Sequence, residues 1–186
     1  EMYSIEAEQW TELTSLPDVV SSHSGCVASD GNIYISGGQY PTGTSPRVLV
    51  YEGTEWQDRP PLLQARCSHV MVSWQDNLLV SGGQALTDGR WVNILTTEMF
   101  DMSTQQWSVL TSPLTQGRVE SGGVVCGDRV YIVGGHSYNS DGRTVSRHNT
   151  ILCLSAPGAS WTQLPVTLPT PVSSLMACLL PLDTHR

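Results

Sequence analysis

The sequence contains no lysine. Its nine basic residues are all arginine and face 17 aspartates and glutamates, for a net charge of −8. A nucleic-acid-binding face neutralises phosphates with clustered cations, and these arginines are scattered along the chain. We therefore predict no nucleic-acid partner. The segment also offers no lysine side chain that could accept ubiquitin or an acetyl group.

Long hydrophobic runs are absent as well. The longest, residues 175–182, is interrupted by Pro181, whereas a membrane-spanning helix needs about 20 apolar residues. The first ten residues, EMYSIEAEQW, lack the basic and apolar regions of a secretory signal peptide. We expect a soluble globular chain that makes no membrane contact.

Cysteine pairs with the spacing of a metal or redox site are missing. The five cysteines are odd in number and stand singly in apolar patterns, with no C-x-x-C. We interpret them as buried reduced thiols that act as small hydrophobic residues. Reduced thiols favour a reducing compartment, so the predicted location is cytoplasmic. The five are Cys26, Cys67, Cys126, Cys153 and Cys178.

Catalytic motifs are equally scarce. The stretch DRVYIVGGHSYNSDGR joins a Gly-Gly pair to an apolar run, but the turn-like residues that follow exclude a phosphate loop that opens a helix. There is no G-x-S-x-G nucleophile motif. The histidines share no metal-ligand spacing, and we expect structural roles for the two that open inner strands, His23 and His69. We predict no enzyme activity, no cofactor and no metal; the other histidines are His136, His148 and His185.

Short apolar runs separated by turn residues dominate the rest, with 17 glycines and 11 prolines. This pattern predicts an all-β chain. Three of the runs end in Gly-Gly: NIYISGG, NLLVSGG and RVYIVGG. The pairs are Gly37 and Gly38, Gly82 and Gly83, and Gly134 and Gly135.

A tryptophan stands 26 or 27 residues before each pair. Trp10, Trp56 and Trp107 hold these positions, and Trp161 begins a fourth interval. The period of about 50 residues is that of a four-stranded propeller blade.

The repeated unit resembles the kelch repeat over nearly the whole chain. In kelch blades the first strand begins near an arginine, the second ends in Gly-Gly and the fourth starts with Trp; Arg66 and Arg118 fill the arginine slot, each 16 residues before its Gly-Gly. Ser21 replaces this arginine in the first unit, and Leu154 replaces the third-strand aromatic in the last. The resemblance implies a kelch-type β-propeller with about three and a half four-stranded blades of a six-bladed ring. The expected parts are two strands of a partial blade in 1–13, blades in 19–59, 65–110 and 117–164, and a closing inner strand in 171–182.

This layout assigns structural roles to the repeated residues. Gly-Gly lets the second strand end where backbones crowd, because a Cβ there would clash. The Trp rings are expected to pack between blades. Because the chain starts in mid-blade and ends on one inner strand, we expect it to be the C-terminal part of a longer propeller, marginally stable or self-associating when isolated.

Candidate binding residues lie in the segments after Gly-Gly, where nearly all length variation occurs. Variable loops on a rigid scaffold are a common binding surface. The candidates there are Gln39, Tyr40, Gln84, Arg90, Trp91, His136 and Tyr138. In kelch-like adaptors the start of the innermost strand faces the same side, which adds Arg66, Arg118, Ser22 and Ser173. For the two arginines, gripping a ligand carboxylate and satisfying loop carbonyls are equally open readings. Trp91 is expected at a loop tip, and Trp74 is expected to be surface-packed.

The resemblance to kelch-like adaptors, which carry BTB and BACK domains upstream, implies a protein-interaction module. We expect the substrate-recognition propeller of a cullin-RING ubiquitin ligase adaptor, which binds a protein substrate or peptide motif. One alternative is a cytoskeletal, actin-binding or scaffolding kelch protein without a role in ubiquitination. A less favoured alternative is an oxidase-type propeller enzyme, which would require a bound metal.

Overall fold

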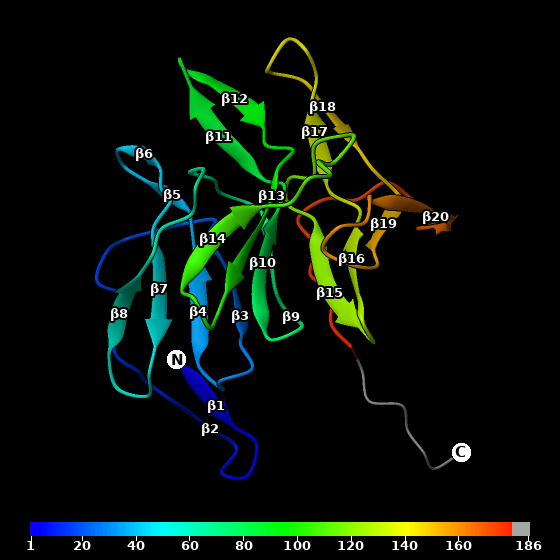
Figure 1. The fold of residues 1–186 in the computed structure, drawn as a ribbon. Helices are drawn as coiled ribbons and strands as arrows, with labels where there is room; N and C mark the ends of the chain where they lie inside the picture. Colours follow the sequence, from blue (N-terminus) through cyan, green and yellow to red (C-terminus); the bar gives the residue numbers. More distant parts are fainter. Residues whose placement is uncertain (180–186) are drawn as a thin grey trace.

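The chain folds entirely into strands and turns. The computed structural model describes residues 1–179, and within them there is no helix (Figure 1). In that part of the chain there is accordingly no helix that could cross a membrane.

Three four-stranded antiparallel sheets form the body of the molecule (Figure 1). Each is ordered as a meander, with the first strand on the inside. The first blade contains β3 (Ser24–Val27), β4 (Ile33–Ser36), β7 (Val48–Tyr51) and β8 (Trp56–Arg59). The second contains β9 (Val70–Trp74), β10 (Asn77–Ser81), β13 (Thr97–Asp101) and β14 (Gln106–Val109). The third contains β15 (Gly122–Cys126), β16 (Arg129–Val133), β19 (Thr150–Leu154) and β20 (Thr162–Thr167). The predicted all-β propeller architecture is confirmed, while the count of six blades stays a prediction.

Four short hairpins complete the fold. At the N-terminus, β1 (Met2–Ser4) pairs with β2 (Gln9–Thr11). The other three lie between the second and third strand of each blade, where the sequence suggested loops. They pair β5 (Gln39–Tyr40) with β6 (Gly43–Thr44), β11 (Gln84–Thr87) with β12 (Arg90–Asn93), and β17 (His136–Tyr138) with β18 (Val145–Arg147).

Each Gly-Gly pair connects its blade to the next segment of the ring. The backbone N–H of Gly38 donates to the carbonyl of Arg66, and that of Gly83 donates to Arg118. Both glycines of a pair have positive φ. A Cβ on Gly82 would lie 2.6 Å from the Arg118 oxygen, so a side chain there would collide with the neighbouring backbone. The pairs therefore serve blade-to-blade packing.

The periodic tryptophans lie at the outer strands and reach toward the preceding blade. The indole N–H of Trp107 donates to the Pro60 carbonyl at 2.8 Å, and that of Trp161 donates to Thr97 Oγ1 at 3.1 Å. Trp10, in the N-terminal hairpin, is 67% exposed.

Trp74 corrects one expectation. It is not surface-packed but 2% exposed, in the apolar cluster between the second and third blades. Its indole N–H donates to the Asp128 carbonyl in the third blade at 2.9 Å. A second apolar cluster, containing Val50, Leu78 and Phe100, fills the space between the first and second blades.

The segment after β20 follows the inner edge of the third blade without forming a strand in residues 171–179. The strand expected in 171–182 is therefore not formed in residues 171–179. Gly135 N–H donates to the Val172 carbonyl at 2.7 Å, and a Cβ on Gly122 would lie 2.6 Å from the Leu175 side chain. Residues 180–182 and His185 lie outside the described residues, and ring closure by this segment stays a prediction.

Candidate protein-binding face

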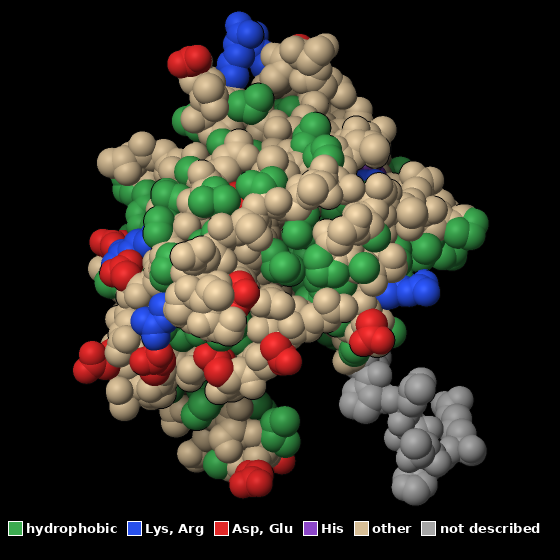
Figure 2. All heavy atoms as spheres, in the orientation of Figure 1, with side chains coloured by type: hydrophobic (Ala, Val, Ile, Leu, Met, Phe, Trp, Pro, Cys, Tyr) green, Lys and Arg blue, Asp and Glu red, His purple; other side chains and the backbone are tan. Residues whose placement is uncertain are grey.

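One end of the blades carries all three inserted hairpins. Each hairpin begins directly after a Gly-Gly pair, and its first residue bridges the segment that enters an inner strand: Ser21 with Gln39, Cys67 with Gln84, and Val119 with His136. The hairpins β11–β12 and β17–β18 rise together from this end (Figure 1). Carboxylates instead gather toward the opposite end, low in the same view (Figure 2). The hairpin end carries charges of both signs (Figure 2), including the exposed Asp88, Arg90 and Arg147.

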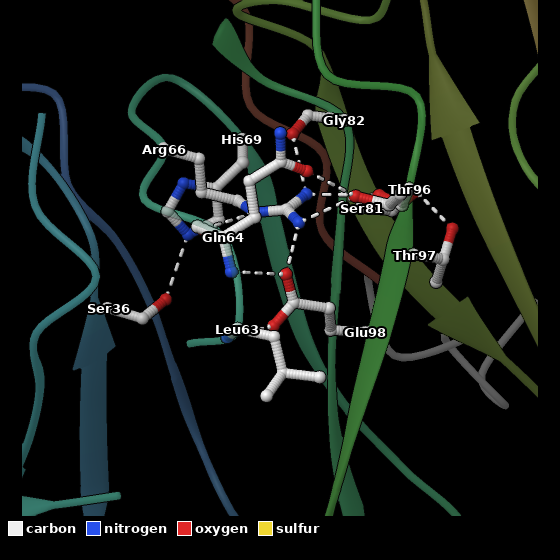
Figure 3. Close-up of polar contacts among 10 residues, drawn as sticks. All are labelled: Ser36, Leu63, Gln64, Arg66, His69, Ser81, Gly82, Thr96, Thr97 and Glu98. Carbon is white, nitrogen blue, oxygen red and sulfur yellow. Dashed lines mark hydrogen bonds and ion pairs between the residues drawn. The ribbon is translucent and has the colours of Figure 1, made fainter. Parts of the chain in front are cut away.

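Arg66, predicted as a candidate ligand-gripping residue, is fully buried at 0% exposure. Its guanidinium donates to the carbonyls of Gly82 and Thr96 at 2.9 and 3.0 Å and forms an ion pair with the buried carboxylate of Glu98 (Figure 3). Glu98 in turn accepts the backbone N–H groups of Leu63 and Gln64. Every strong partner of Arg66 is internal, so its role is to hold the loop carbonyls rather than a ligand.

Arg118, the second arginine predicted as a candidate ligand-gripping residue, is buried as well. It is 1% exposed and donates to the Gly134 carbonyl at 3.2 Å and to Thr150 Oγ1 at 2.7 Å. No carboxylate pairs with it among residues 1–179. Burial away from water lowers the pKa of Arg118 to about 10, because it disfavours the charged form. Both arginines therefore belong to the blade interior.

The inner strands of the blades border an axial groove, and its mouth is formed by residues that stand two positions after these arginines. Ser68 and Glu120 have φ of 54°, as does Ser22, and Ser174 has φ of 58°. Their backbones form a relay along the ring: Ser68 N–H donates to Ser22 oxygen, Glu120 to Ser68, and Ser174 to Glu120, at 2.8 to 2.9 Å. Ser22 and Ser173 were expected near this edge, whereas Ser68, Glu120 and Ser174 were missed. The spacing of the sequence repeats did not reveal that these residues have a left-handed backbone, a conformation that only glycine and a few polar residues adopt readily.

A groove of about 1140 Å³ runs along the inner strands below this mouth. It is bounded by β3, β9, β15 and the segment after Ser174. Its walls are mostly apolar or small, including Ile35, Val70 and Leu175. The groove is therefore an axial channel segment with a polar rim.

The predicted hairpin residues divide into exposed and buried sets. Gln39 is exposed and Tyr40 partly so, whereas Gln84 and His136 are each 8% exposed. The His136 ring stacks edge-on against Tyr138 with centroids 5.6 Å apart. Burial lowers the pKa of His136 despite the nearby Glu120 carboxylate. Gln84 and His136 thus support the hairpin bases, while Gln39, Tyr40 and Tyr138 present surface.

A second groove, of about 580 Å³, separates the hairpins β11–β12 and β17–β18. Arg90, Trp91 and Tyr138 line it. The side chain of Asn93 fastens the two hairpins, since its amide nitrogen donates to the Tyr138 carbonyl at 2.8 Å and its oxygen accepts the Tyr138 N–H at 2.9 Å. These two hydrogen bonds hold the groove in its shape before any ligand binds. The role of Asn93 was not recognised from the sequence.

The histidine and acidic side chains are dispersed in the described part of the chain. Within residues 1–179, no three His, Cys, Asp or Glu side chains lie together as a metal site. His69 bonds Ser36 Oγ through Nε2 at 2.8 Å and is 4% exposed.

Comparison with known proteins agrees with this geometry. The family model described as the KLHDC2/KLHL20/DRC7 Kelch-repeats domain matches residues 1–184. Kelch-like protein 36 of Mus musculus is 29% identical over 189 residues, covering 98% of this chain and 30% of that protein. Kelch-like protein 34 of Homo sapiens is 30% identical over 158 residues, covering 81% of this chain and 23% of that protein.

A solved structure shares the fold. The structure of YjhT aligns with a TM-score of 0.68 at 16% identity, covering 84% of this chain and 54% of that chain. The present chain spans less than a third of the length of the kelch-like relatives named above. Its family supports a protein-interaction propeller. From the three blades, their Gly-Gly junctions and the match over residues 1–184, the chain belongs to the family of KLHDC2/KLHL20/DRC7 Kelch-repeats domains.

Proposed function

We propose that this propeller segment recognises a protein substrate with its hairpin face and acts in the substrate-binding part of a cullin-RING ubiquitin ligase adaptor. The observation that carries the recognition role is the gathering of three hairpins at one end of the blades, around the mouth of an axial groove. The ligase role is drawn from the resemblance of the repeats to those of kelch-like adaptors.

The surface has the composition that protein recognition requires. Trp91 is half-buried, and Tyr40 and Tyr138 are partly exposed. Part of each aromatic ring can therefore contact a partner protein while the blades stay folded. Aromatic and arginine side chains provide most of the energy at protein interfaces. The Asn93 clamp fixes two of the hairpins in advance, which lowers the entropy lost on binding.

A cytoplasmic location is part of the proposal. All five cysteines are free thiols. Cys67 and Cys153 are buried, but Cys126 and Cys178 are exposed, so the expectation of five buried thiols was wrong for these two. Free thiols suit a reducing compartment.

The test is affinity purification of the full-length protein from cells, with wild type compared with Trp91→Ala. The matched control is Asp76→Asn, at an exposed turn of the opposite end where positive φ suits asparagine. We expect a cullin scaffold to co-purify with all three proteins, and at least one further protein to be lost only from Trp91→Ala.

Two results would contradict the proposal in different ways. Absence of a cullin from every sample removes the ligase role and favours the scaffolding alternative. A set of partners unchanged by Trp91→Ala, with a native melting temperature, argues against the hairpin face.

A further inference from the structure

The axial groove contains a single ionised side chain among its described lining residues. Serines, glycines and aliphatic residues make up most of the wall, and Glu120 is the only acid or arginine among them. Its side chain is 40% exposed at the mouth. The two lining histidines do not offset this charge, because burial lowers the pKa of His69 to about 3 and also lowers that of His23.

Glu120 is held in place without a cationic partner. The hydroxyl of Ser174 donates to its Oε2. His136 Nδ1 lies 3.8 Å from the same oxygen, but burial favours the neutral ring. Within residues 1–179, Oε1 accepts no hydrogen bond. One carboxylate oxygen is therefore free to accept from a ligand.

Hydroxyl groups flank this carboxylate along the rim. Ser22 and Ser68 occupy the equivalent left-handed positions in the neighbouring blades, tied to Glu120 by the backbone relay. Both line the groove. No hydrogen bond of the Ser22 hydroxyl is found within residues 1–179, while the Ser68 hydroxyl lies beside the Cys67 thiol and can still accept from a ligand. The rim thus offers one negative charge and two neutral acceptors in a fixed order.

We propose that this rim binds an arginine side chain of the protein partner, with the guanidinium paired to Glu120 and its remaining N–H groups donating to serine hydroxyls. This inference rests on the proposed function and names the chemistry of its substrate. A guanidinium presents five donors in a planar fork and pairs well with carboxylates. Its aliphatic stem can lie along the apolar wall near Val70 and Leu175.

The described part of the rim disfavours an acidic ligand. Because Arg66 and Arg118 are buried and internally bonded, no arginine lines the groove to hold an acidic motif. An acidic segment would meet the Glu120 carboxylate and lose affinity through like-charge repulsion. The net charge of −8 also attracts basic partners at long range.

The experiment is selection of a random peptide display library on the immobilised full-length protein. Wild type is compared with Glu120→Gln, with Glu120→Arg, and with the Asp76→Asn control, which removes the same charge at the opposite end. We expect wild type and Asp76→Asn to enrich arginine-containing peptides. Glu120→Gln should weaken the best peptide about tenfold or more, and Glu120→Arg should select acidic peptides instead.

Unchanged thermal unfolding of the variants will separate loss of binding from loss of fold. Selected peptides that lack arginine, or that bind Glu120→Gln as well as wild type, overturn the arginine rim while leaving the proposed function standing. Enrichment of lysine without arginine overturns the choice of guanidinium. If no peptide is enriched, the inference falls, and the purification experiment with Trp91→Ala decides the proposed function separately.

Discussion

The backbone N–H of Gly83 donates a 2.8 Å hydrogen bond to the carbonyl oxygen of Arg118 in the next blade. The same contact joins Gly38 to Arg66 and Gly135 to Val172. A repeated sequence feature thus has a repeated physical cause, namely the close approach of one blade's backbone to its neighbour.

Replacing Gly83 by alanine should lower the free energy of unfolding by about 3 kcal/mol or more. Its φ is +84°, and a Cβ would lie 2.6 Å from the Cys67 oxygen. Gly89 is the matched control: its φ is +72°, but no atom lies within 4 Å of the added Cβ. Gly89→Ala should cost only about 1 kcal/mol. Urea unfolding of both variants checks this, and equal losses would show that backbone strain, not the close approach, is the cause.

Removing the Arg66 side chain should destabilise the protein by about 3 to 5 kcal/mol. Arg66→Ala would leave the buried Glu98 carboxylate without its cation. The exposed Arg90 is the comparison, and Arg90→Ala should change stability by less than about 0.5 kcal/mol. Adding Glu98→Gln to Arg66→Ala should restore part of the loss, since an amide oxygen can still accept from Leu63. Stable, unperturbed Arg66→Ala protein would return this arginine to the candidate ligand residues.

The buried His69 predicts loss of stability in mild acid. Burial lowers its folded-state pKa to about 3, whereas an unfolded histidine has a pKa of about 6.5. Between these values the unfolded chain binds the extra proton, so stability falls as pH drops below about 6.5. From pH 7.5 to 5 the loss assigned to His69 is about 2 kcal/mol.

The measurement is the free energy of unfolding at both pH values for wild type and His69→Gln. Glutamine can still bond Ser36 but does not titrate. His23, His136 and His148 remain in both proteins, and burial lowers the pKa of each. The variant should therefore lose less stability on acidification, and an identical pH dependence would contradict the assignment.

Trp74 should contribute to stability as a core residue. Trp74→Phe loses the bond to the Asp128 carbonyl and should cost about 1 kcal/mol, while Trp74→Ala should cost about 3 to 5 kcal/mol. Trp91→Ala, on the surface of β12, should cost less than about 1 kcal/mol. Comparing the three by urea unfolding tests the placement, and a neutral Trp74→Ala would argue against burial between blades.

Some of these features could be predicted from the sequence because they depend on local requirements. Gly-Gly marks a positive φ at a crowded strand end, and the tryptophan spacing follows the length of four short strands. The burial of Arg66 could not be predicted, since it depends on Glu98, 32 residues away. The core position of Trp74 likewise depends on Asp128, 54 residues away.

On the hairpin face, too, some features could be predicted from the sequence and others could not. The variable lengths after Gly-Gly led us to predict a binding surface there. The β11–β12 hairpin was not foreseen, because its two strands have four residues each and half of these residues are exposed. The rim residues Ser68 and Glu120 were missed for a different reason: their direction is set by a left-handed backbone bonded between blades. Such contacts between repeats have no signature within one repeat.

Hydrogen exchange of the full-length protein, measured by mass spectrometry with and without a purified bound partner, tests the binding face most directly. The account predicts partner-dependent protection in β11–β12, β17–β18 and the rim around Glu120, with none at the opposite turns near Asp76 and Asp128. Protection confined to those opposite turns would contradict it.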